Sequence, residues 1–294
     1  MKVGITGGTG FLGKEVSTLL EKEGHIPVII GRSPFNGKTK YEYRSTDYSI
    51  ESLNKVLDGN QAVVHLAAVR GSKGCISDFH QNEIITENLL KSCINIGITN
   101  IVIASSIAVY SKVESIPWTE EQLPSPKTLY GISKISCEYM ADLYHKEYEL
   151  NIKSLRIAQI LGEGERKGFM MNTFIDNAFH KKRLNVIGES LAKREFVYIK
   201  DVAKAFLLAI LNPKISGAFN IGSGEAYSNL EIAKIINECF NNEGNLLYND
   251  KLKEGIESSL MDCSKSRNEL GYIAQFSLRK ALNEIKNFKK GEDV

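Results

Sequence analysis

The sequence has no strong excess of charge of either sign and no long hydrophobic run. Its 294 residues carry 37 Lys and Arg against 35 Asp and Glu, which gives a net charge of +2. This balance gives no reason to expect nucleic acid or an anionic membrane as the main partner. Because no apolar run approaches the ~18 residues that a membrane helix needs, no membrane span is predicted. Anions are therefore expected to bind only at local sites.

Cysteine is scarce and scattered. The five cysteines are odd in number and none belongs to a C-x-x-C pair: Cys75, Cys93, Cys137, Cys239 and Cys263. This usage is typical of reduced thiols and argues against a disulfide framework or a zinc site. The histidines show no metal-ligand spacing either (His25, His80, His145 and His180), so we predict no metal. The chain begins with MKVGITGG, which predicts a strand instead of a targeting leader, and the expected location is the cytoplasm.

The first half of the chain alternates short apolar runs with longer helical patterns. Runs rich in Val and Ile predict buried strands over residues 2–6, 26–30, 62–67, 100–106 and 152–161. Helical spacing predicts helices over 11–24, 49–59, 78–97 and 201–212. Strand–helix repetition of this kind predicts an α/β protein with a parallel sheet covered by helices on both faces.

The regular alternation fades from about Glu163 onward. Short helices and polar connections then predict a smaller second lobe, which the chain leaves once to return to the first domain. We assign residues 1–165 and 195–222 to the first domain, and residues 166–194 and 223–294 to the second lobe. The end of the chain, KNFKKGEDV over 286–294, is expected to be a solvated tail.

A glycine-rich segment joins the first predicted strand to the first predicted helix. Gly7, Gly10 and Gly13 form a G-x-x-G-x-x-G pattern in VGITGGTGFLGKEV. Glycine lets the backbone turn tightly and approach a pyrophosphate, and the helix N-terminus offers N–H groups and a positive dipole end. Glycines also occur in plain strand–helix turns, but a position inside a strand–helix–strand unit is the context that a dinucleotide site requires. We therefore expect NAD or NADP to bind here.

The second predicted strand ends in GRS, where an NAD-specific site usually has an acid for the ribose 2′-hydroxyl. Arg32 and Ser33 could instead hold a 2′-phosphate, which favours NADP over NAD. The simpler alternative is that Arg32 stacks on the adenine. Asp47, in the segment STDYS, is placed to accept from the adenine amino group, although an exposed capping residue would look the same.

The segment TLYGISKISCEYM places Tyr130 one helical turn before Lys134. A cation on the same helix face stabilises a phenolate, so the pair could act in proton transfer. An ordinary surface pair on an amphipathic helix has the same spacing, and Y-x-x-x-K alone does not decide between the two.

Six segments together favour the proton-transfer interpretation of this pair. They are TGGTGFLG, VVHLAA, ASSIAVY, YGISK, REFVYIKDVA and FNIGSG, and they occur in this order. From residue 1 to about 275, the chain resembles the extended short-chain dehydrogenase/reductase family in its nucleotide-sugar epimerase/dehydratase branch. The resemblance implies a Rossmann-type doubly wound parallel sheet, a smaller α/β C-terminal substrate lobe and a homodimer formed through two long helices per subunit.

The resemblance also implies roles for individual residues. Tyr130 is the expected acid/base on a sugar hydroxyl or ketone, Lys134 stabilises its phenolate and can bind the nicotinamide ribose, and Ser106 hydrogen-bonds the reacting oxygen. Alignment on the following VY selects Ser106 over Ser105. The expected cofactor-binding residues are Gly7, Gly10, Phe11, Leu12, Gly13, Arg32, Ser33, Asp47, Leu66, Ala67, Ala68, Tyr130 and Lys134. His65 is expected to be a packing residue.

On the substrate side, the resemblance implies that Arg194 binds the diphosphate of the nucleotide sugar. A planar guanidinium suits this ligand. Asn172 matches a position that contacts the same diphosphate, and Lys253 stands where the family has a second arginine. Two further positions depart from the family pattern: Gln159 replaces an Asn, and Glu195 replaces the Asp after the arginine.

The segment after Ser106 limits the reaction. Family 4,6-dehydratases usually carry an acid just after the catalytic serine or threonine, whereas this chain has SIAVYS. Two enzyme hypotheses remain, and both involve hydride transfer at C4 of a nucleotide-linked hexose, with UDP the nucleotide expected from family frequency. The first, a little favoured, is a UDP-hexose or UDP-N-acetylhexosamine 4-epimerase. The second is an NADPH-dependent 4-keto-6-deoxy-sugar nucleotide reductase. A non-catalytic NADP sensor is a third alternative, but such proteins typically lose the Tyr/Lys pair.

Overall fold

The computed structural model describes residues 1–294 except 33–36, 38, 72–73, 167, 252–254 and 293–294. Ser33 and Lys253, both predicted site residues, therefore lie outside the described residues. The strands are β1 Lys2–Thr6, β2 Ile26–Gly31, β3 Glu42–Ser45, β4 Ala62–His65, β5 Asn100–Ala104, β6 Asn151–Ile157, β7 Gln159–Leu161, β8 Leu184–Ile187, β9 Lys193–Tyr198, β10 Gly217–Ile221, β11 Ala226–Ser228 and β12 Leu246–Asn249. The α-helices are α1 Phe11–Lys22, α2 Ile50–Leu57, α3 Ile76–Ile96, α4 Leu129–Tyr148, α5 Met170–Phe179, α6 Ile199–Leu211, α7 Asn229–Phe240 and α8 Leu278–Glu292, and the short helical turns are η1 Ile107–Val109, η2 Val113–Ser115 and η3 Ser266–Leu270.

The main sheet has the strand order β10-β6-β5-β4-β1-β2-β3, and its neighbouring strands all pair in parallel. The chain moves outward from β1 to β3 and then returns to place β4 on the other side of β1. Such a reversal leaves a crevice at the carboxyl ends of the strands, where ligands bind in this class of sheet. The predicted Rossmann-type doubly wound parallel sheet is confirmed.

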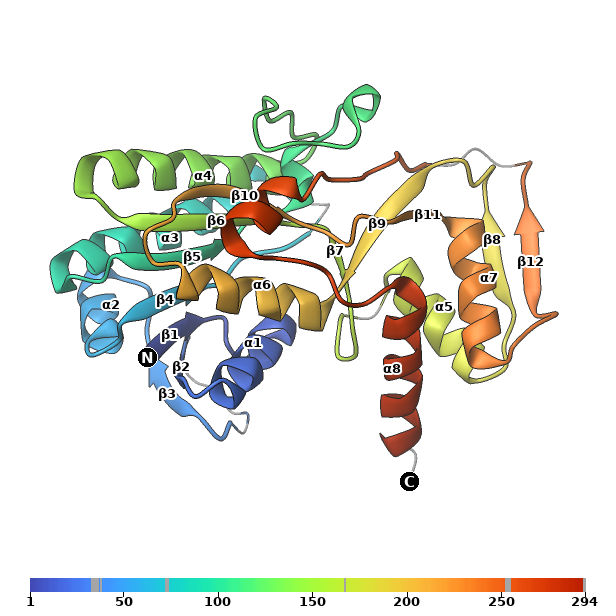
Figure 1. Ribbon diagram of the computed structural model, residues 1–294, viewed down its shortest axis with the longest axis horizontal. Coiled ribbons are helices and arrows are strands. Elements are labelled where there is room, and N and C mark those ends of the chain that lie inside the picture. The colour runs from blue at the N-terminus through green and yellow to red at the C-terminus, as the bar shows by residue number, and fades with distance from the viewer. Residues whose placement is uncertain (33–36, 38, 72–73, 167, 252–254, 293–294) are drawn as a thin grey trace.

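Helices cover both faces of this sheet (Figure 1). One apolar cluster joins α1 and α6 to the sheet, through residues such as Val16 and Phe206, and a second joins α2, α3 and α4 through residues such as Leu53 and Leu90. The strands carry Val and Ile on both sides because both faces are buried. The rigid sheet thus fixes where the loops at its carboxyl edge can lie.

A smaller α/β lobe lies beside the sheet, on the right in Figure 1. It contains α5, α7 and α8 and the parallel pair β8 and β12, which share a third apolar cluster. A three-stranded sheet with the order β11-β9-β7 connects the lobe with the main sheet.

Three details differ from the expectations. The strand predicted over 152–161 breaks at Ala158, because β7 leaves the main sheet and pairs with β9. Within the segment predicted for the second lobe, Met261, Leu270 and Tyr272 belong to the apolar cluster of the main sheet. The prediction of a solvated tail over 286–294 is wrong up to residue 292, because α8 continues to that point. Within this helix, the Lys289 Nζ lies 2.8 Å from the Asp176 carboxylate.

Candidate functional site

The glycine turn between β1 and α1 has no room for a side chain at Gly7 or Gly13. Gly7 has a φ of +69°, and a Cβ on it would lie 2.8 Å from the Ala67 nitrogen. A Cβ on Gly13 would lie 2.4 Å from the Gly7 carbonyl oxygen. Gly10, the N-cap of α1, is exposed and has open space around it apart from that carbonyl. A bare backbone therefore faces outward at a helix N-terminus, which fits the pyrophosphate of a dinucleotide.

The turn is held against the end of β4 by Thr6. Its Oγ1 accepts from the Leu66 and Ala67 N–H groups at 3.2 and 3.3 Å, and lies 2.7 Å from His65 Nδ1. Burial lowers the pKa of His65 to about 3, so the ring is neutral, and its Nε2 lies 3.2 Å from Thr86 Oγ1. The structure thus brings Gly7, Leu66 and Ala67 together. It gives His65 a packing and hydrogen-bonding position.

The remaining predicted cofactor residues border the same edge. Phe11 and Leu12 begin α1 and are partly buried, and Ala68 follows Ala67 in the loop after β4. Arg32 follows β2 with an exposed side chain, and its carbonyl accepts from the Tyr43 hydroxyl at 2.8 Å. The exposed Asp47 accepts from the Ser49 N–H at 2.8 Å, and hydrogen bonds from Ser49 lower the pKa of Asp47. That contact belongs to the turn before α2, and the adenine contact stays a prediction.

Two adjacent serines follow β5 and have different surroundings. The Ser105 hydroxyl is buried and donates to the Glu138 carboxylate. The Ser106 side chain is half-buried, and its Oγ accepts from the Ala108 N–H at 3.1 Å as the N-cap of η1. Because Ser105 is engaged below the surface, Ser106 is the hydroxyl of this pair that remains at the carboxyl edge of the sheet. The catalytic role of Ser106 stays a prediction.

Tyr130 and Lys134 lie in the first two turns of α4, which begins after the N-cap Thr128. The Lys134 Nζ is 5.7 Å from the centre of the Tyr130 ring and donates to the Ala104 carbonyl at 2.8 Å. Ala104 ends β5 two residues before Ser106. The structure therefore brings the lysine to the tyrosine and both to the strand that carries the serine, at the edge where the sheet opens.

On the substrate side, Arg194 lies in β9 with a half-buried side chain. Its Nη2 donates to Asn229 Oδ1 at 2.8 Å and contacts Met170 Sδ at 3.4 Å. Asn172 is in α5, two residues after Met170, and its Nδ2 donates to the Arg166 carbonyl at 2.8 Å. The elements that carry Arg194 and Asn172 therefore adjoin.

The two positions that depart from the family pattern lie in the connecting sheet. Gln159 begins β7 and pairs with Phe196 of β9. Glu195 is fully buried, and its carboxylate accepts from the N–H groups of Gly224 at 2.9 Å and Met261 at 3.0 Å. Burial raises the pKa of Glu195 to about 7.

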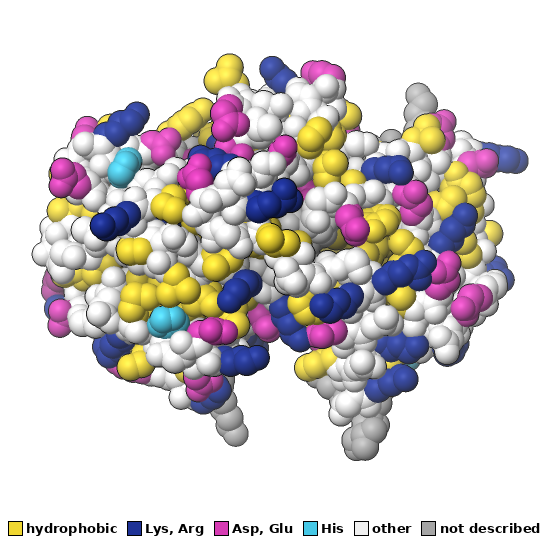
Figure 2. Space-filling view, in the orientation of Figure 1, with side chains coloured by type: hydrophobic (Ala, Val, Ile, Leu, Met, Phe, Trp, Pro, Cys, Tyr) yellow, Lys and Arg dark blue, Asp and Glu magenta, His cyan; other side chains and the backbone are white. Residues whose placement is uncertain are grey.

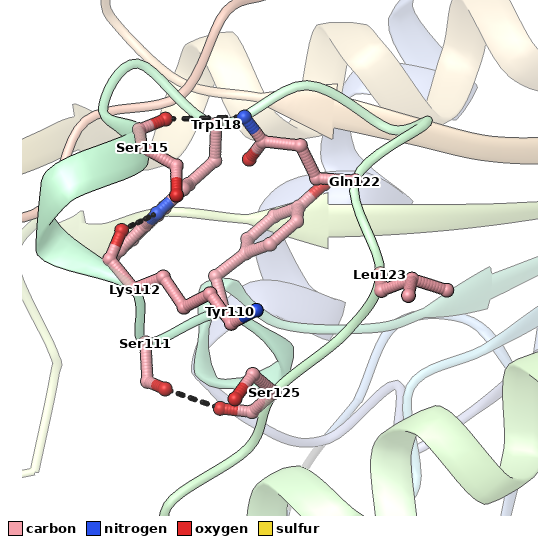
Figure 3. Close-up of a pocket in the computed structure, with 8 residues that line it drawn as sticks. All are labelled: Tyr110, Ser111, Lys112, Ser115, Trp118, Gln122, Leu123 and Ser125. Carbon is pink, nitrogen blue, oxygen red and sulfur yellow. Dashed lines mark hydrogen bonds between the residues drawn. The ribbon is translucent and has the colours of Figure 1, made fainter.

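A pocket of about 190 Å³ lies under the loop that follows η1 (Figure 3). Tyr110 and Trp118 stack inside it with ring centres 5.2 Å apart, and the Trp118 Nε1 donates to the Lys112 carbonyl at 2.7 Å. The pocket contains none of the predicted site residues. It adjoins them through Tyr110, which comes four residues after Ser106.

The surface shows mixed charge. In Figure 2, Lys and Arg side chains alternate with Asp and Glu over the visible face, and a notch separates the main body from the smaller lobe. Within the described residues, no helix is long and apolar enough to cross a membrane. The same residues contain no group of three His, Cys, Asp or Glu side chains that could hold a metal ion.

The fold and the glycine turn define a dinucleotide-binding protein. The chain belongs to the NAD dependent epimerase/dehydratase family, whose model matches residues 3–222. The family resemblance seen in the sequence is thereby confirmed, and the protein is an NAD(P)-dependent enzyme of this family.

Known proteins resemble the whole chain. A UDP-N-acetylglucosamine 4-epimerase from Bacillus cereus, solved by crystallography, is 43% identical with a TM-score of 0.92, over 99% of this chain and 97% of its own. An uncharacterized UDP-glucose epimerase from Bacillus subtilis is 27% identical over 97% of each chain. A dTDP-4-dehydro-6-deoxyglucose reductase from Escherichia coli is also 27% identical, over 96% of this chain and 95% of its own.

Some residues that shape the site did not stand out in the sequence. Asn82 of α3 accepts from the Val69 N–H at 2.7 Å and donates to Ser133 Oγ at 3.2 Å, so it joins the loop after β4 to α4. Glu138 joins Ser105 to α4. A polar residue on the buried face of a predicted helix is the signal for Asn82, and the spacing of four residues after Lys134 is the signal for Glu138.

Proposed function

We propose that this protein is a UDP-hexose 4-epimerase, with UDP-N-acetylglucosamine as the first substrate to test. The observation that carries the proposal is that Lys134 contacts both the Tyr130 ring and the end of β5, two residues before Ser106. The resemblance over the full chain to a UDP-N-acetylglucosamine 4-epimerase, at 43% identity, supports both the reaction and the N-acetylated sugar.

In this proposal the chain's own groups manage the proton on the C4 oxygen. Tyr130, as the phenolate, removes the proton from the 4-hydroxyl and later returns it to the oxygen of the 4-ketone. Lys134 stabilises the phenolate through its positive charge, and its hydrogen bond to Ala104 fixes the ammonium group. Ser106 donates to the same oxygen and orients it. A nicotinamide held at the glycine turn would supply the acceptor for the C4 hydride and the donor that returns it to the opposite face of the 4-ketone.

The other predicted residues receive binding roles. Arg194 and Asn172 bind the substrate diphosphate, since their elements adjoin through Met170 and a guanidinium suits phosphate oxygens. The segment that follows Ser106 carries no acid before Glu114. The elimination of water across C5 and C6 therefore lacks its acid and base, and a 4,6-dehydratase is not proposed.

For the cofactor, we infer a preference for NADP over NAD. Arg32 supports it, because an exposed arginine at the end of β2 stands where NAD-specific sites have an acid. Arg32 also favours a second candidate function, an NADPH-dependent 4-keto-6-deoxy-sugar nucleotide reductase, and the 27% identity to a reductase from Escherichia coli supports it too. Titration of the stripped protein with NAD(H) and NADP(H) tests the cofactor. An NAD preference would overturn the role of Arg32 and leave the epimerase proposal standing.

A homodimer in the cytoplasm completes the proposal. The helices α3 and α4 lie side by side and expose apolar side chains, among them Ile84, Ile132, Tyr139 and Leu143. A partner that presents the same two helices would cover this face as a four-helix packing. The reducing compartment is supported by the five cysteines, all of them free.

The test is an inversion assay. Wild-type protein is incubated with UDP-N-acetylglucosamine and, separately, with UDP-glucose, and the C4 configuration of the product is determined by proton NMR. We expect inversion without net use of cofactor. A Tyr130→Phe variant should bind NAD(H) or NADP(H) as tightly as wild type and lose turnover by roughly a hundredfold or more. Normal turnover in this variant, or consumption of one NADPH for each 4-keto sugar reduced without inversion, would overturn the proposal.

A further inference from the structure

A buried ion pair lies directly below the proposed catalytic residues. Glu138 of α4 and Arg156 of β6 are both buried. The Arg156 Nη2 and Nε both donate to Glu138 Oε2, at 2.7 and 3.0 Å, so two hydrogen bonds join the guanidinium to the carboxylate. Removing two charges from water costs more than such a pair usually returns, so a buried pair is weak evidence for a stabilising role. Its place in the fold indicates another role.

The pair fixes the segment that carries Ser106 at two points. On one side, the Ser105 hydroxyl donates to the Glu138 carboxylate. On the other side, the Arg156 Nη1 donates to the Tyr110 hydroxyl at 2.6 Å. Ser106 stands between these anchors, one residue after Ser105 and four before Tyr110. Backbone hydrogen bonds also hold this segment, from the Ser105 N–H to the Leu155 carbonyl and from the Val109 N–H to the Ser106 carbonyl. The side-chain anchors on either side of Ser106 both lead to the same ion pair.

The same pair also fixes the helix that carries the tyrosine and lysine. Glu138 follows Lys134 by four residues and Tyr130 by eight, so the three share one face of α4. Lys134 is tied to β5 through the Ala104 carbonyl at 2.8 Å, and Glu138 is tied to β5 through Ser105. Two contacts one helical turn apart prevent α4 from sliding along β5.

The network continues to the edge of the sheet. The Tyr110 hydroxyl donates to Asn220 Oδ1 of β10 at 2.9 Å, and the Asn220 Nδ2 donates to the Trp118 carbonyl at 2.9 Å. The loop after η1, with its pocket (Figure 3), is therefore fastened to the same pair. A rigid connection thus runs from β10 through Arg156 and Glu138 to α4.

We infer that Glu138 and Arg156 are positioning residues, which hold Ser106 at the distance from Tyr130 and Lys134 that the reaction at C4 requires. The inference rests on the proposed function, because it assigns the pair a role only through those three residues. Errors of position well below one ångström lower the rate of a chemical step while leaving remote substrate contacts intact. Loss of the pair should therefore reduce kcat far more than it changes KM.

The test replaces the pair by apolar residues of similar volume, Glu138→Leu with Arg156→Met, because such replacements of buried ion pairs commonly leave proteins folded. Unfolding is monitored by circular dichroism. The kinetic constants are measured with UDP-N-acetylglucosamine carrying protium or deuterium at C4. The matched control, Glu238→Leu with Arg279→Met, removes an exposed pair between α7 and α8.

We expect the buried-pair variant to lose kcat by about tenfold to a hundredfold, to change KM by less than about threefold and to show a larger deuterium isotope effect on kcat. The control should match wild type. A folded variant with kcat within about twofold of wild type would overturn the inference. So would a fall in kcat with an unchanged isotope effect, since that indicates fewer active molecules.

If the double variant does not fold, Ser105→Ala, which removes one anchor only, is judged by the same three readouts: kcat, KM and the isotope effect. Tyr130→Phe is assayed beside them: if it turns over normally, the proposed function has failed, and if it is inactive, the result concerns the pair alone.

Discussion

At the scale of the residue, burial decides what the polar groups of this protein can do. His65 is neutral because it has no water around it, and Ser105 is committed to Glu138. Ser106, one residue further on, is half-buried and stands at the open edge of the sheet. Neighbouring residues of one type thus have different uses, and the difference lies in their surroundings.

Glu195 gives a prediction at this scale. Burial raises its pKa from 4.5 to about 7, so between these values the folded chain holds a proton that the unfolded chain has released. Stability from this group is present below pH 4.5 and is lost as the pH rises through 7, by an amount on the order of 3 kcal/mol. A Glu195→Gln variant is neutral throughout. The free energy of unfolding of wild type, minus that of the variant, should therefore fall between pH 5 and pH 8.

Urea unfolding at the two pH values measures this difference. Glu121→Gln, which removes a carboxylate at an exposed position, is the control for the loss of one charge. If wild type and Glu195→Gln change in parallel with pH, Glu195 does not hold a proton near neutrality.

At the scale of the element, the glycine turn and α1 were predictable because a short local pattern determines them. Gly7 needs a positive φ, and Gly13 must approach the backbone of Gly7. The first helix was predicted over 11–24 and lies at 11–22. The break at Ala158 was not predictable, because the apolar run continues through it and only the pairing of β7 with β9 ends the strand. Likewise, α8 packs on the smaller lobe through Leu282 and Ile285, and its Lys289 pairs with the distant Asp176, contacts that no local pattern reveals.

Gly13→Ala tests the turn. A methyl group there would meet the Gly7 carbonyl oxygen at 2.4 Å, so the backbone must shift. We expect a loss of about 1–3 kcal/mol in stability and at least roughly a tenfold weaker affinity for the dinucleotide. Gly291→Ala in α8, where nothing lies within 4 Å, is the control and should match or slightly exceed wild type in stability. Calorimetric titration with NAD(H) and NADP(H) gives the affinity. Unchanged affinity in Gly13→Ala would place the dinucleotide elsewhere.

At the scale of the whole molecule, a parallel sheet covered by helices was predictable from the alternation of strands and helices, whereas the distribution of the last third of the chain was not. Residues 261–272 carry no periodic pattern that marks them as part of the first domain. Met261 and Tyr272 nevertheless lie in the core of the main sheet. Contacts between segments far apart in the chain, such as Ser105 with Glu138 and Glu138 with Arg156, likewise leave no local signal.

The proposed dimer is tested at this scale. Tyr139 and Leu143 are 58% and 50% exposed on one face of α4, so charges at both positions should break a packing of α3 and α4 between two copies. We expect Tyr139→Glu with Leu143→Glu to sediment as a monomer at concentrations where wild type sediments as a dimer. Leu211→Glu, which changes a residue 49% exposed on α6, is the control and should remain dimeric. A wild-type monomer, or a dimeric double variant, would contradict the proposed interface.

The central claim is that Ser106, Tyr130 and Lys134 serve a reversible transfer of hydride at C4 of a UDP-hexose. The most direct test uses UDP-N-acetylglucosamine labelled with deuterium at C4 and follows the label by NMR and mass spectrometry. We predict that the product has the inverted configuration and keeps its deuterium at C4, with no cofactor consumed. A C4-inverted product that carries protium at C4, or the absence of inversion with every UDP-hexose tested, would contradict the account.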